Sequence, residues 1–409
     1  MAKNRTMLLF VFSTFISGLG GAFLFPISSI YLVEALGASP KMLSVYMMSS
    51  VIAGITVSYQ LAKLSDRGFS RKNLIAVAMV CYFLTAVIFA FNRDYWVALV
   101  TVVVVTSISS AAFPQIFALG REYADSYLGD KGTLFLNTMR AGIAIAWVCG
   151  PPLAFMTQAE YGFTYSFLVT AACSCVSLIV ALNLPDIGCA PNNEDAGLPE
   201  VNSAFVPIPW YRNGQVVLFF IAVVLMFYAN NLYIISMPLY VTQDLGLHSG
   251  IAGKMMGLAA LSEIPIMLGI GIVASRHGAH RILMIGVAFG AVFYAGMLSY
   301  SLPWQMMTLQ VFNGLFIGAT ATMGMVVMQD LMKNQMGVAT TLFSNGMQTS
   351  MLLSSMTIGI VGEYFSYHEA FFVSFIMAML SLLTMAFQSV LNRRKSGING
   401  DECFGETSA

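Results

Sequence analysis

The sequence is poor in charge. Lysine, arginine, aspartate and glutamate together make up 9% of its 409 residues, and acids and bases cancel to a net charge of zero. A soluble domain of this length could not cover its surface with polar atoms, because 58% of its residues are hydrophobic. The mean hydropathy of +0.77 instead predicts a polytopic membrane protein in contact with the lipid bilayer. A chain without net charge gives no reason to expect a nucleic-acid partner.

Residues that carry chemistry are also scarce. The four histidines lie near expected helix ends, and no pair of the six cysteines has the spacing of metal ligands. The cysteines are interpreted as small apolar packing residues. The sequence has no catalytic constellation and no glycine-rich phosphate loop. We therefore expect no enzyme activity, no cofactor and no metal site.

Long apolar stretches are what the sequence has in abundance. Twelve of them reach the length of a membrane-spanning helix, at residues 7–36, 42–62, 73–91, 95–119, 133–156, 162–184, 214–242, 250–274, 282–300, 304–329, 337–362 and 368–391. The first stretch is too long for a cleavable signal peptide, and no small-residue cleavage site follows it. The predicted fold class is an all-α membrane protein with twelve transmembrane helices.

The few charges sort by side of the membrane. One set of helix ends carries most of the bases, namely Lys3, Arg5, Lys63, Arg67, Arg71, Lys72, Arg121, Lys131, Arg212, Arg276, Arg281, Lys333, Arg393, Arg394 and Lys395. The opposite set has only Lys41, Arg93 and Lys254. The positive-inside rule makes the first side cytoplasmic and places both termini inside.

The chain repeats itself at an offset of about 208 residues. Residues 133–140 read TLFLNTMR and 341–348 read TLFSNGMQ, while 31–37 (YLVEALG) return as 240–246 (YVTQDLG). We predict two pseudo-symmetric six-helix halves, 1–184 and 214–395. A polar, proline-containing cytoplasmic linker at 185–213 joins them, and a short cytoplasmic tail follows at 396–409.

The most informative stretch runs from residue 133 to residue 152. On a helix, Thr133, Asn137, Arg140, Trp147 and Pro151 share one face, and the other faces are apolar. Arg140 would lie roughly 10 Å inside the membrane. A charge at that depth is costly unless it faces a partner or water, so we interpret this face as a functional site.

Further polar groups lie deep in the expected spans. They are Gln115 in the first half and Asn230, Asn231, Glu263, Gln310, Asn313, Asn345 and Gln348 in the second. A hydrogen bond between helices explains each amide alone equally well. As a set they favour a hydrated polar cavity, and we predict substrate contacts from Gln115, Asn137, Arg140, Trp147 and the six second-half amides.

The turn after the second span contains a recognisable loop. It reads LAKLSDRGFSRK at 61–72 and resembles the signature loop of the major facilitator superfamily, G-x-L-A-D-R-x-G-R-K. Ala62 replaces the first glycine, and one extra residue precedes the basic pair. The second half repeats the loop as GIVASRHGAHR at 271–281, which a plain basic loop would not explain. The resemblance implies a cytoplasmic gate formed by Asp66, Arg67, Gly68, Arg71, Arg276 and Gly278.

The fifth span ends with a second superfamily pattern. Its sequence Ala146-x-x-x-Gly150-Pro151 resembles the antiporter motif, although Ala154 and Phe155 replace the terminal glycines of that motif. The motif implies a kinked helix whose smooth face packs against the opposite half, so Gly150 and Pro151 join the predicted gating residues. It favours export over uptake.

Longer segments narrow the resemblance. The segments are PQIFALGREYAD (114–125), MRAGIAIAWVCGPPLAF (139–155), LSEIPIM (261–267), FNGLFIG (312–318) and QDLMKNQMGVATTLFSN (329–345). They resemble the bacterial sugar efflux transporter (SET) family of the major facilitator superfamily, over nearly the whole chain. The resemblance implies the major facilitator fold, a place in the bacterial inner membrane, alternating access, and export of small sugars or glycosides in exchange for protons. The expected functional unit is a monomer.

Three other functions remain open from the residues. A multidrug or other metabolite exporter of the same fold predicts an apolar cavity with one acid, whereas amides line several spans here. A membrane sensor that binds sugar would normally append a soluble output domain larger than residues 396–409. A membrane enzyme would need a catalytic constellation.

Arg140 and Glu263 are the clearest opposite charges well inside the spans, one in each half. If they approach each other in one state and separate in another, Glu263 takes up and releases a proton while Arg140 stays charged. We predict that they are the proton-coupling pair. The alternative is a static buried ion pair that orients helices.

Overall fold

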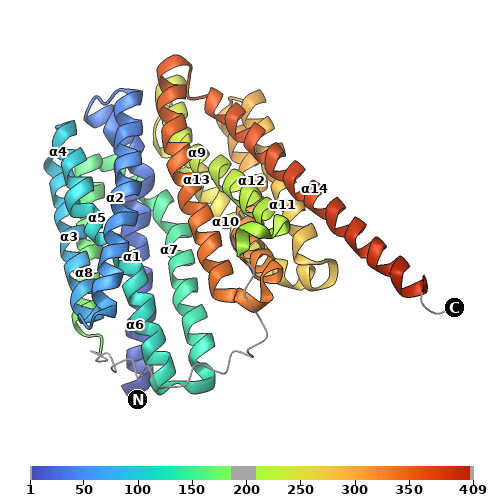
Figure 1. Cartoon of the computed structure of the whole chain (residues 1–409). Helices are drawn as coiled ribbons and strands as arrows, with labels where there is room; N and C mark the ends of the chain where they lie inside the picture. The colour runs from blue at the N-terminus through green and yellow to red at the C-terminus, as the bar shows by residue number, and fades with distance from the viewer. Residues whose placement is uncertain (1, 186–208, 406–409) are drawn as a thin grey trace. The chain divides into compact units, whose positions relative to one another are not determined.

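The computed structural model describes residues 2–185 and 209–405, and within these ranges the chain is helical with short connections (Figure 1). Most of the expected linker, at 186–208, lies outside the described residues, as do residues 406–409 of the expected tail. The helices of the first half are α1 (Ala2–Ile30), α2 (Pro40–Asp66), α3 (Arg71–Phe91), α4 (Tyr95–Val100), α5 (Ser107–Ser109), α6 (Ala112–Tyr127), α7 (Gly132–Tyr161) and α8 (Phe163–Leu182). Those of the second half are α9 (Gly214–Leu239), α10 (Gly250–His277), α11 (Ala279–Ser299), α12 (Pro303–Leu331), α13 (Met336–Tyr364) and α14 (Glu369–Gly405).

Short π-helical and 3₁₀ segments link or extend these helices. They are η1 (Tyr31–Ala35), η2 (Thr101–Thr106), η3 (Gly129–Lys131), η4 (Trp210–Arg212), η5 (Tyr240–Asp244) and η6 (Lys333–Gln335). The segments α4, η2, α5 and α6 follow one another along the fourth expected span. Together they form a single helical stretch, Tyr95–Tyr127, which η2 interrupts as a π-helical segment.

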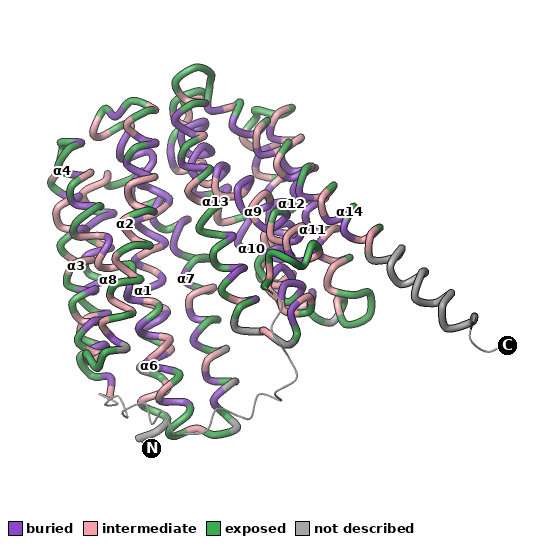
Figure 2. The backbone as a smooth tube through the Cα atoms, in the orientation of Figure 1, coloured by how far each residue is buried: buried purple, intermediate pink, exposed green. Residues whose placement is uncertain are grey.

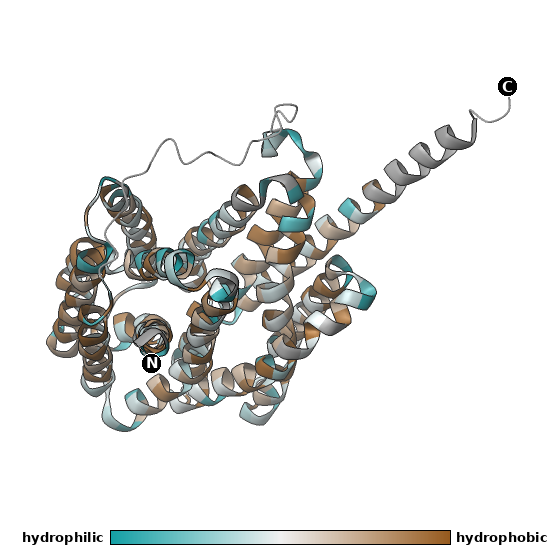
Figure 3. Ribbon diagram, turned by 90° about the horizontal axis from the view of Figure 1, so that it is seen from below, coloured by the Kyte–Doolittle hydropathy of each residue, from teal (hydrophilic) through white to brown (hydrophobic). Residues whose placement is uncertain are grey.

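The lengths of the helices agree with the expected membrane spans. In the described part of the chain, ten helices are long and apolar enough to cross a bilayer, and α10 makes an eleventh with a bend of 41° between Gly250–Met267 and Gly269–His277. The twelfth expected span coincides with α13, which is long enough but carries many polar residues. Figure 3 shows the hydrophobic residues along the helices, with strongly hydrophilic ones gathered mainly near helix ends and loops. The predicted all-α membrane fold is confirmed for the described residues, and the ten or eleven spans found there are consistent with the twelve expected.

By backbone contacts the chain divides into two compact units. The first contains Met1–Val201, Ile234–Ala260 and Ser355–Tyr367, and the second contains Asn202–Tyr233, Leu261–Ser354 and His368–Ala409. The first unit thus takes in the end of α9, the beginning of α10 and the end of α13. The predicted halves, 1–184 and 214–395, describe the sequence repeat and stay a prediction.

In the first unit, α1 packs closely along α7. Small residues meet at the contact, namely Thr14, Gly18 and Ala22 on α1, and Gly142, Ala146 and Gly150 on α7. A Cβ atom added at Gly18 would lie 3.0 Å from the Cβ of Ala146, and one added at Gly150 would overlap the Cβ of Ala22. Small residues four apart let two membrane helices approach until their backbones are close together. Consistent with this close packing, nearly all residues toward the C-terminal end of α1 are buried (Figure 2).

In the second unit, α11 packs against α12 by the same principle. A Cβ added at Gly290 would lie 2.6 Å from the ring of Phe316, and one added at Gly296 would lie 2.5 Å from Leu309. Aromatic rings of Phe293, Tyr294 and Phe316 fill the space beside these glycines. The unit therefore has a densely packed apolar core beside its glycine contacts.

The repeat seen in the sequence is also a repeat of backbone geometry. The first helix of each half, α1 and α9, ends in a π-helical turn, η1 and η5 respectively. Gly37 and Gly246 follow with φ of 64° and 61°. Gly68 and Gly278, in the two copies of the signature loop, have φ of 99° and 88°. Glycine recurs in both loops because the turn needs a backbone conformation that other residues rarely adopt.

Candidate functional site

The predicted site begins on α7, which continues as one helix through Pro151 and Pro152. Arg140 and Trp147 are both exposed on this helix, and Trp147 contacts Phe25 of α1 edge-on at 6.2 Å between ring centroids. Arg140 has no ion pair or hydrogen bond to any described side chain. It lies within the candidate span Leu134–Tyr161, where a charge in contact with lipid is costly, so we expect its guanidinium to face water or a polar ligand. The side chain of Asn137 lies outside the described residues.

The second polar helix is α13, in the second unit. Asn345 and Gln348 are exposed on it, at the repeat positions of Asn137 and Arg140. The opposite side of α13 is buried, and a Cβ added at Gly346 would lie 3.0 Å from Val223 of α9. A spanning helix with exposed amides on one side and a packed face on the other is typical of a cavity wall.

Other predicted amides are buried and bonded to one another. Gln310 and Asn313 are 0% and 2% exposed, and Asn313 Nδ2 donates to Gln310 Oε1 at 3.0 Å. The hydroxyl of Tyr233 donates to the same oxygen at 3.1 Å, so a hydrogen bond links α9 to α12. No sequence pattern indicated this bond. Whether these amides also contact substrate stays a prediction.

The two predicted amides of α9, Asn230 and Asn231, shortly precede Tyr233 in the chain. Asn231 Nδ2 donates to Ser350 Oγ of α13 at 3.0 Å. Asn230 is half-buried, and its Oδ1 is enclosed without a hydrogen-bond partner among the described residues. An enclosed acceptor of this kind costs free energy unless water or a ligand donates to it.

Glu263 lies on α10 in the segment that precedes the bend. Its side chain is half-buried, and no described residue pairs with its carboxylate. Pro265 and Gly269 border the bend, and both residue types weaken a helix at that point. Arg140 belongs to the first compact unit and Glu263 to the second, so their pairing stays a prediction.

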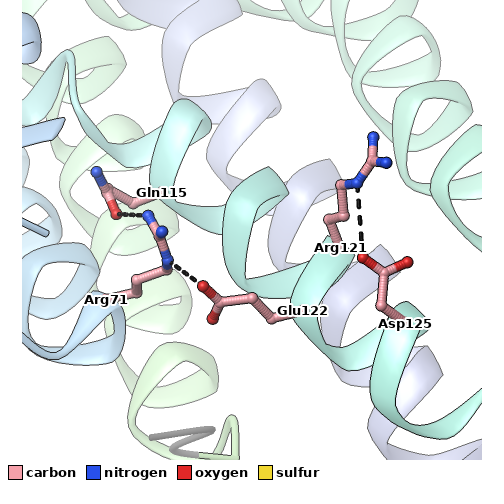
Figure 4. A network of polar contacts seen from close by, with 5 residues as sticks. All are labelled: Arg71, Gln115, Arg121, Glu122 and Asp125. Atoms are coloured by element: carbon pink, nitrogen blue, oxygen red, sulfur yellow. Dashed lines mark hydrogen bonds and ion pairs between the residues drawn. The ribbon is translucent and has the colours of Figure 1, made fainter. Parts of the chain in front are cut away.

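The signature loop carries a polar network at the start of α3 (Figure 4). Arg71 Nε donates to Glu122 Oε1 at 2.6 Å, and Arg71 Nη1 donates to Gln115 Oε1 at 3.2 Å. Both partners lie on α6, and Gln115 is 2% exposed. Arg71 therefore fastens α3 to α6, and the amide of Gln115, which the sequence placed in the substrate set, is engaged in this network.

The other predicted gating residues occupy helix ends. Arg67 and Gly68 are exposed in the turn after α2, and Arg276 and Gly278 are exposed at the end of α10. Asp66 is the last residue of α2, but its side chain lies outside the described residues. Gly150 and Pro151 are both buried on α7, and Gly150 lies in the contact with α1 described above. No group of His, Cys, Asp or Glu in the described part of the chain could hold a metal ion.

Removing the Arg71 guanidinium should destabilise the protein. Arg71→Gln leaves Glu122 and Gln115 without their donor, and we expect a loss of about 1–2 kcal/mol because water reaches part of the site. Arg121→Gln is the matched control, since the pair of Arg121 with Asp125 is long, at 3.6 Å, and both side chains are at least 70% exposed. Thermal unfolding of the purified variants in detergent measures both. Equal losses in the two variants would contradict this role for Arg71.

Comparison with known proteins agrees with this geometry. The sequence profile of the Major Facilitator Superfamily matches residues 10–207 and 219–402. Among solved structures, the nucleoside transporter NupG superposes with a TM-score of 0.75 at 16% identity, over 94% of this chain and 98% of that one. A bacterial homologue of the iron transporter ferroportin superposes with a TM-score of 0.70 at 13% identity, over 94% and 98%. The fold is that of a major facilitator membrane transporter.

Curated relatives narrow the assignment. "Sugar efflux transporter A" of Escherichia coli is 36% identical over 94% of this chain and 96% of its own length. "Sugar efflux transporter A" of Dickeya chrysanthemi is 37% identical over 91% and 93%, and "Sugar efflux transporter C" of E. coli is 36% identical over 94% and 96%. The chain belongs to the sugar efflux transporter family of the major facilitator superfamily.

Proposed function

We propose that the protein exports small sugars or glycosides across the bacterial inner membrane by alternating access. The observation that supports this proposal is that α7 and α13 expose polar residues at matching repeat positions, namely Arg140 on α7, and Asn345 and Gln348 on α13. Helix α7 is a candidate membrane span, and α13 coincides with the twelfth span expected from the sequence. Amides and a guanidinium supply the donors and acceptors that sugar hydroxyls need. Trp147, also exposed on α7, offers an aromatic face for a sugar ring. The names of the relatives support the substrate class.

Protons are the proposed driving ion. Glu263 is an unpaired carboxylate, among the described residues, within a span of the second unit. Proton entry would then be coupled to sugar exit, with Arg140 as the fixed charge that Glu263 meets in part of the cycle. The sequence has no nucleotide-binding loop, so an ion gradient or the substrate gradient has to supply the energy. The monomer is the proposed transport unit.

The gate on the cytoplasmic side is proposed to be the pair of signature loops. The positive-inside distribution of bases supports this side as cytoplasmic, with both termini inside. Asp66 and Arg67 of the first loop, and Arg276 of the second, would hold the halves together there when the opposite side is open. Gly68 and Gly278 supply the turns that position these charges.

Counterflow in proteoliposomes tests the proposed function. Vesicles with purified protein, preloaded with an unlabelled sugar panel, should take up labelled sugar transiently at rates well above protein-free vesicles. Arg140→Gln should lower the rate by about tenfold or more, because a charge-assisted hydrogen bond to the ligand is lost. Arg140→Lys keeps the charge and should retain more activity. If lipophilic cations show counterflow and none of the sugars does, the protein is a multidrug exporter instead.

A further inference from the structure

The ends of α2 and α13 that we predict to be noncytoplasmic meet in the first compact unit. Lys41, in the first turn of α2, places its Nζ 2.9 Å from Oε1 of Glu363, in the last turn of α13. The same Nζ lies 5.8 Å from the ring centroid of Tyr364. Ser39 caps this end of α2 by accepting from Met42 N at 3.3 Å, which fixes the turn that carries the lysine.

Below the ion pair the two helices touch at backbone distance. Ser44 Oγ donates to the backbone oxygen of Ser355 at 2.6 Å. A Cβ added at Gly359 would overlap Ser44, and one added at Gly362 would lie 2.8 Å from Pro40. Small residues thus form the contact between α2 and α13, and the ion pair lies at its solvent-exposed end.

The repeat-related contact lacks that charge. In it, α10 meets α7, and a Cβ added at Gly253 would lie 2.7 Å from Phe155, while one at Gly257 would lie 3.2 Å from Pro152. The repeat positions of Lys41 and Glu363 are occupied by Gly250 and Phe155. The two contacts close these helix ends in similar ways, but only one of them has an ion pair.

We propose that Lys41 and Glu363 form a latch that biases the noncytoplasmic side toward the closed state and separates each time that side opens to release substrate. The proposal rests on the alternating access proposed above. The side chain of Lys41 is 62% exposed and that of Glu363 is 28% exposed. A pair this accessible to water changes an equilibrium by only about two- to fivefold. A stronger bond would slow opening, so a weak latch suits a step repeated in every cycle.

Spin-label distances between α2 and α13 can test the latch. A cysteine-free background with Val45→Cys and Ile360→Cys carries the labels, since both positions are exposed on these helices. Lys41→Ala and Glu363→Gln should each raise the population of molecules in which the two labels are far apart by about two- to fivefold. The charge-swapped double variant Lys41→Glu with Glu363→Lys should restore the wild-type distribution. High salt should act on the wild type as the single variants do.

Lys254→Ala is the matched control. It removes an exposed lysine from the same predicted side, and no described residue pairs with Lys254. An unchanged distance distribution in Lys41→Ala, or a charge swap that fails to restore it, would overturn the latch. Sugar counterflow measured on the same labelled protein separates the two proposals. Counterflow with no latch effect rejects only the latch, whereas a latch effect without sugar counterflow rejects only the substrate assignment.

Discussion

Glu263→Gln is expected to abolish accumulation of sugar against its gradient while sugar exchange continues. Glutamine matches the size and most hydrogen-bonding capacity of the carboxylic acid, but it cannot take up or release a proton. Uncoupled from protons, the transporter would let sugar equilibrate, so the accumulation ratio should fall to about one. The structure favours this residue because its carboxylate is half-buried in a bent span and has no described partner.

Two assays on the same vesicles make the result specific. Accumulation driven by a pH gradient measures coupling, and counterflow without a gradient measures the sugar pathway alone. Glu160→Gln is the control, because Glu160 is an exposed acid at the end of α7 and should leave both assays unchanged. If Glu263→Gln still concentrates sugar at the normal rate, Glu263 is not the coupling group.

In that case, the contacts of the other acids indicate which of them is the next candidate for the proton-coupling group. Glu122 accepts from Arg71 at 2.6 Å, and Glu34 accepts from Gln243 at 3.2 Å, so both are already engaged. Asp330, exposed near the end of α12, has no described partner and would be the next candidate.

Sequence patterns predicted the features that depend on spacing along one helix. Hydrophobic length indicated the spans, and the offset of the repeat indicated the matching positions of Arg140 and Gln348. The recurring glycine of the signature loop was explained once Gly68 and Gly278 were found with positive φ. These features are local, so the order of residues is enough to predict them.

Contacts between distant helices were not predictable from the sequence. Gln310 and Asn313 look like cavity amides in the sequence, yet Tyr233 binds Gln310 and both amides are buried. Lys41 and Glu363 each flank an expected span, and nothing in the neighbouring sequence indicated that they pair. Which buried amide meets a partner depends on helix rotation and packing, and these are set by many apolar contacts at once.

Helix packing also sets the other large expected effect, at Gly150. This residue is buried where α7 crosses α1, and any Cβ there would overlap the Cβ of Ala22. Gly150→Leu should force the two helices apart or distort them, at a cost of about 3 kcal/mol or more, since the neighbouring backbone cannot yield as a flexible side chain would. Because α7 also carries Arg140 and Trp147, transport should be lost together with stability.

Three variants make this test quantitative by thermal unfolding in detergent and by yield of folded protein. Gly21→Ala is the control on α1, because a Cβ at Gly21 meets nothing within 4 Å and alanine favours the helix. It should melt at or slightly above the wild-type temperature. Gly150→Ala should melt lower, and combining it with Ala22→Gly should recover most of the loss, because the methyl group then changes helix without adding volume. If Gly150→Leu melts like the wild type, or the exchange of methyl groups recovers nothing, the close contact of α1 with α7 is not what requires glycine at position 150.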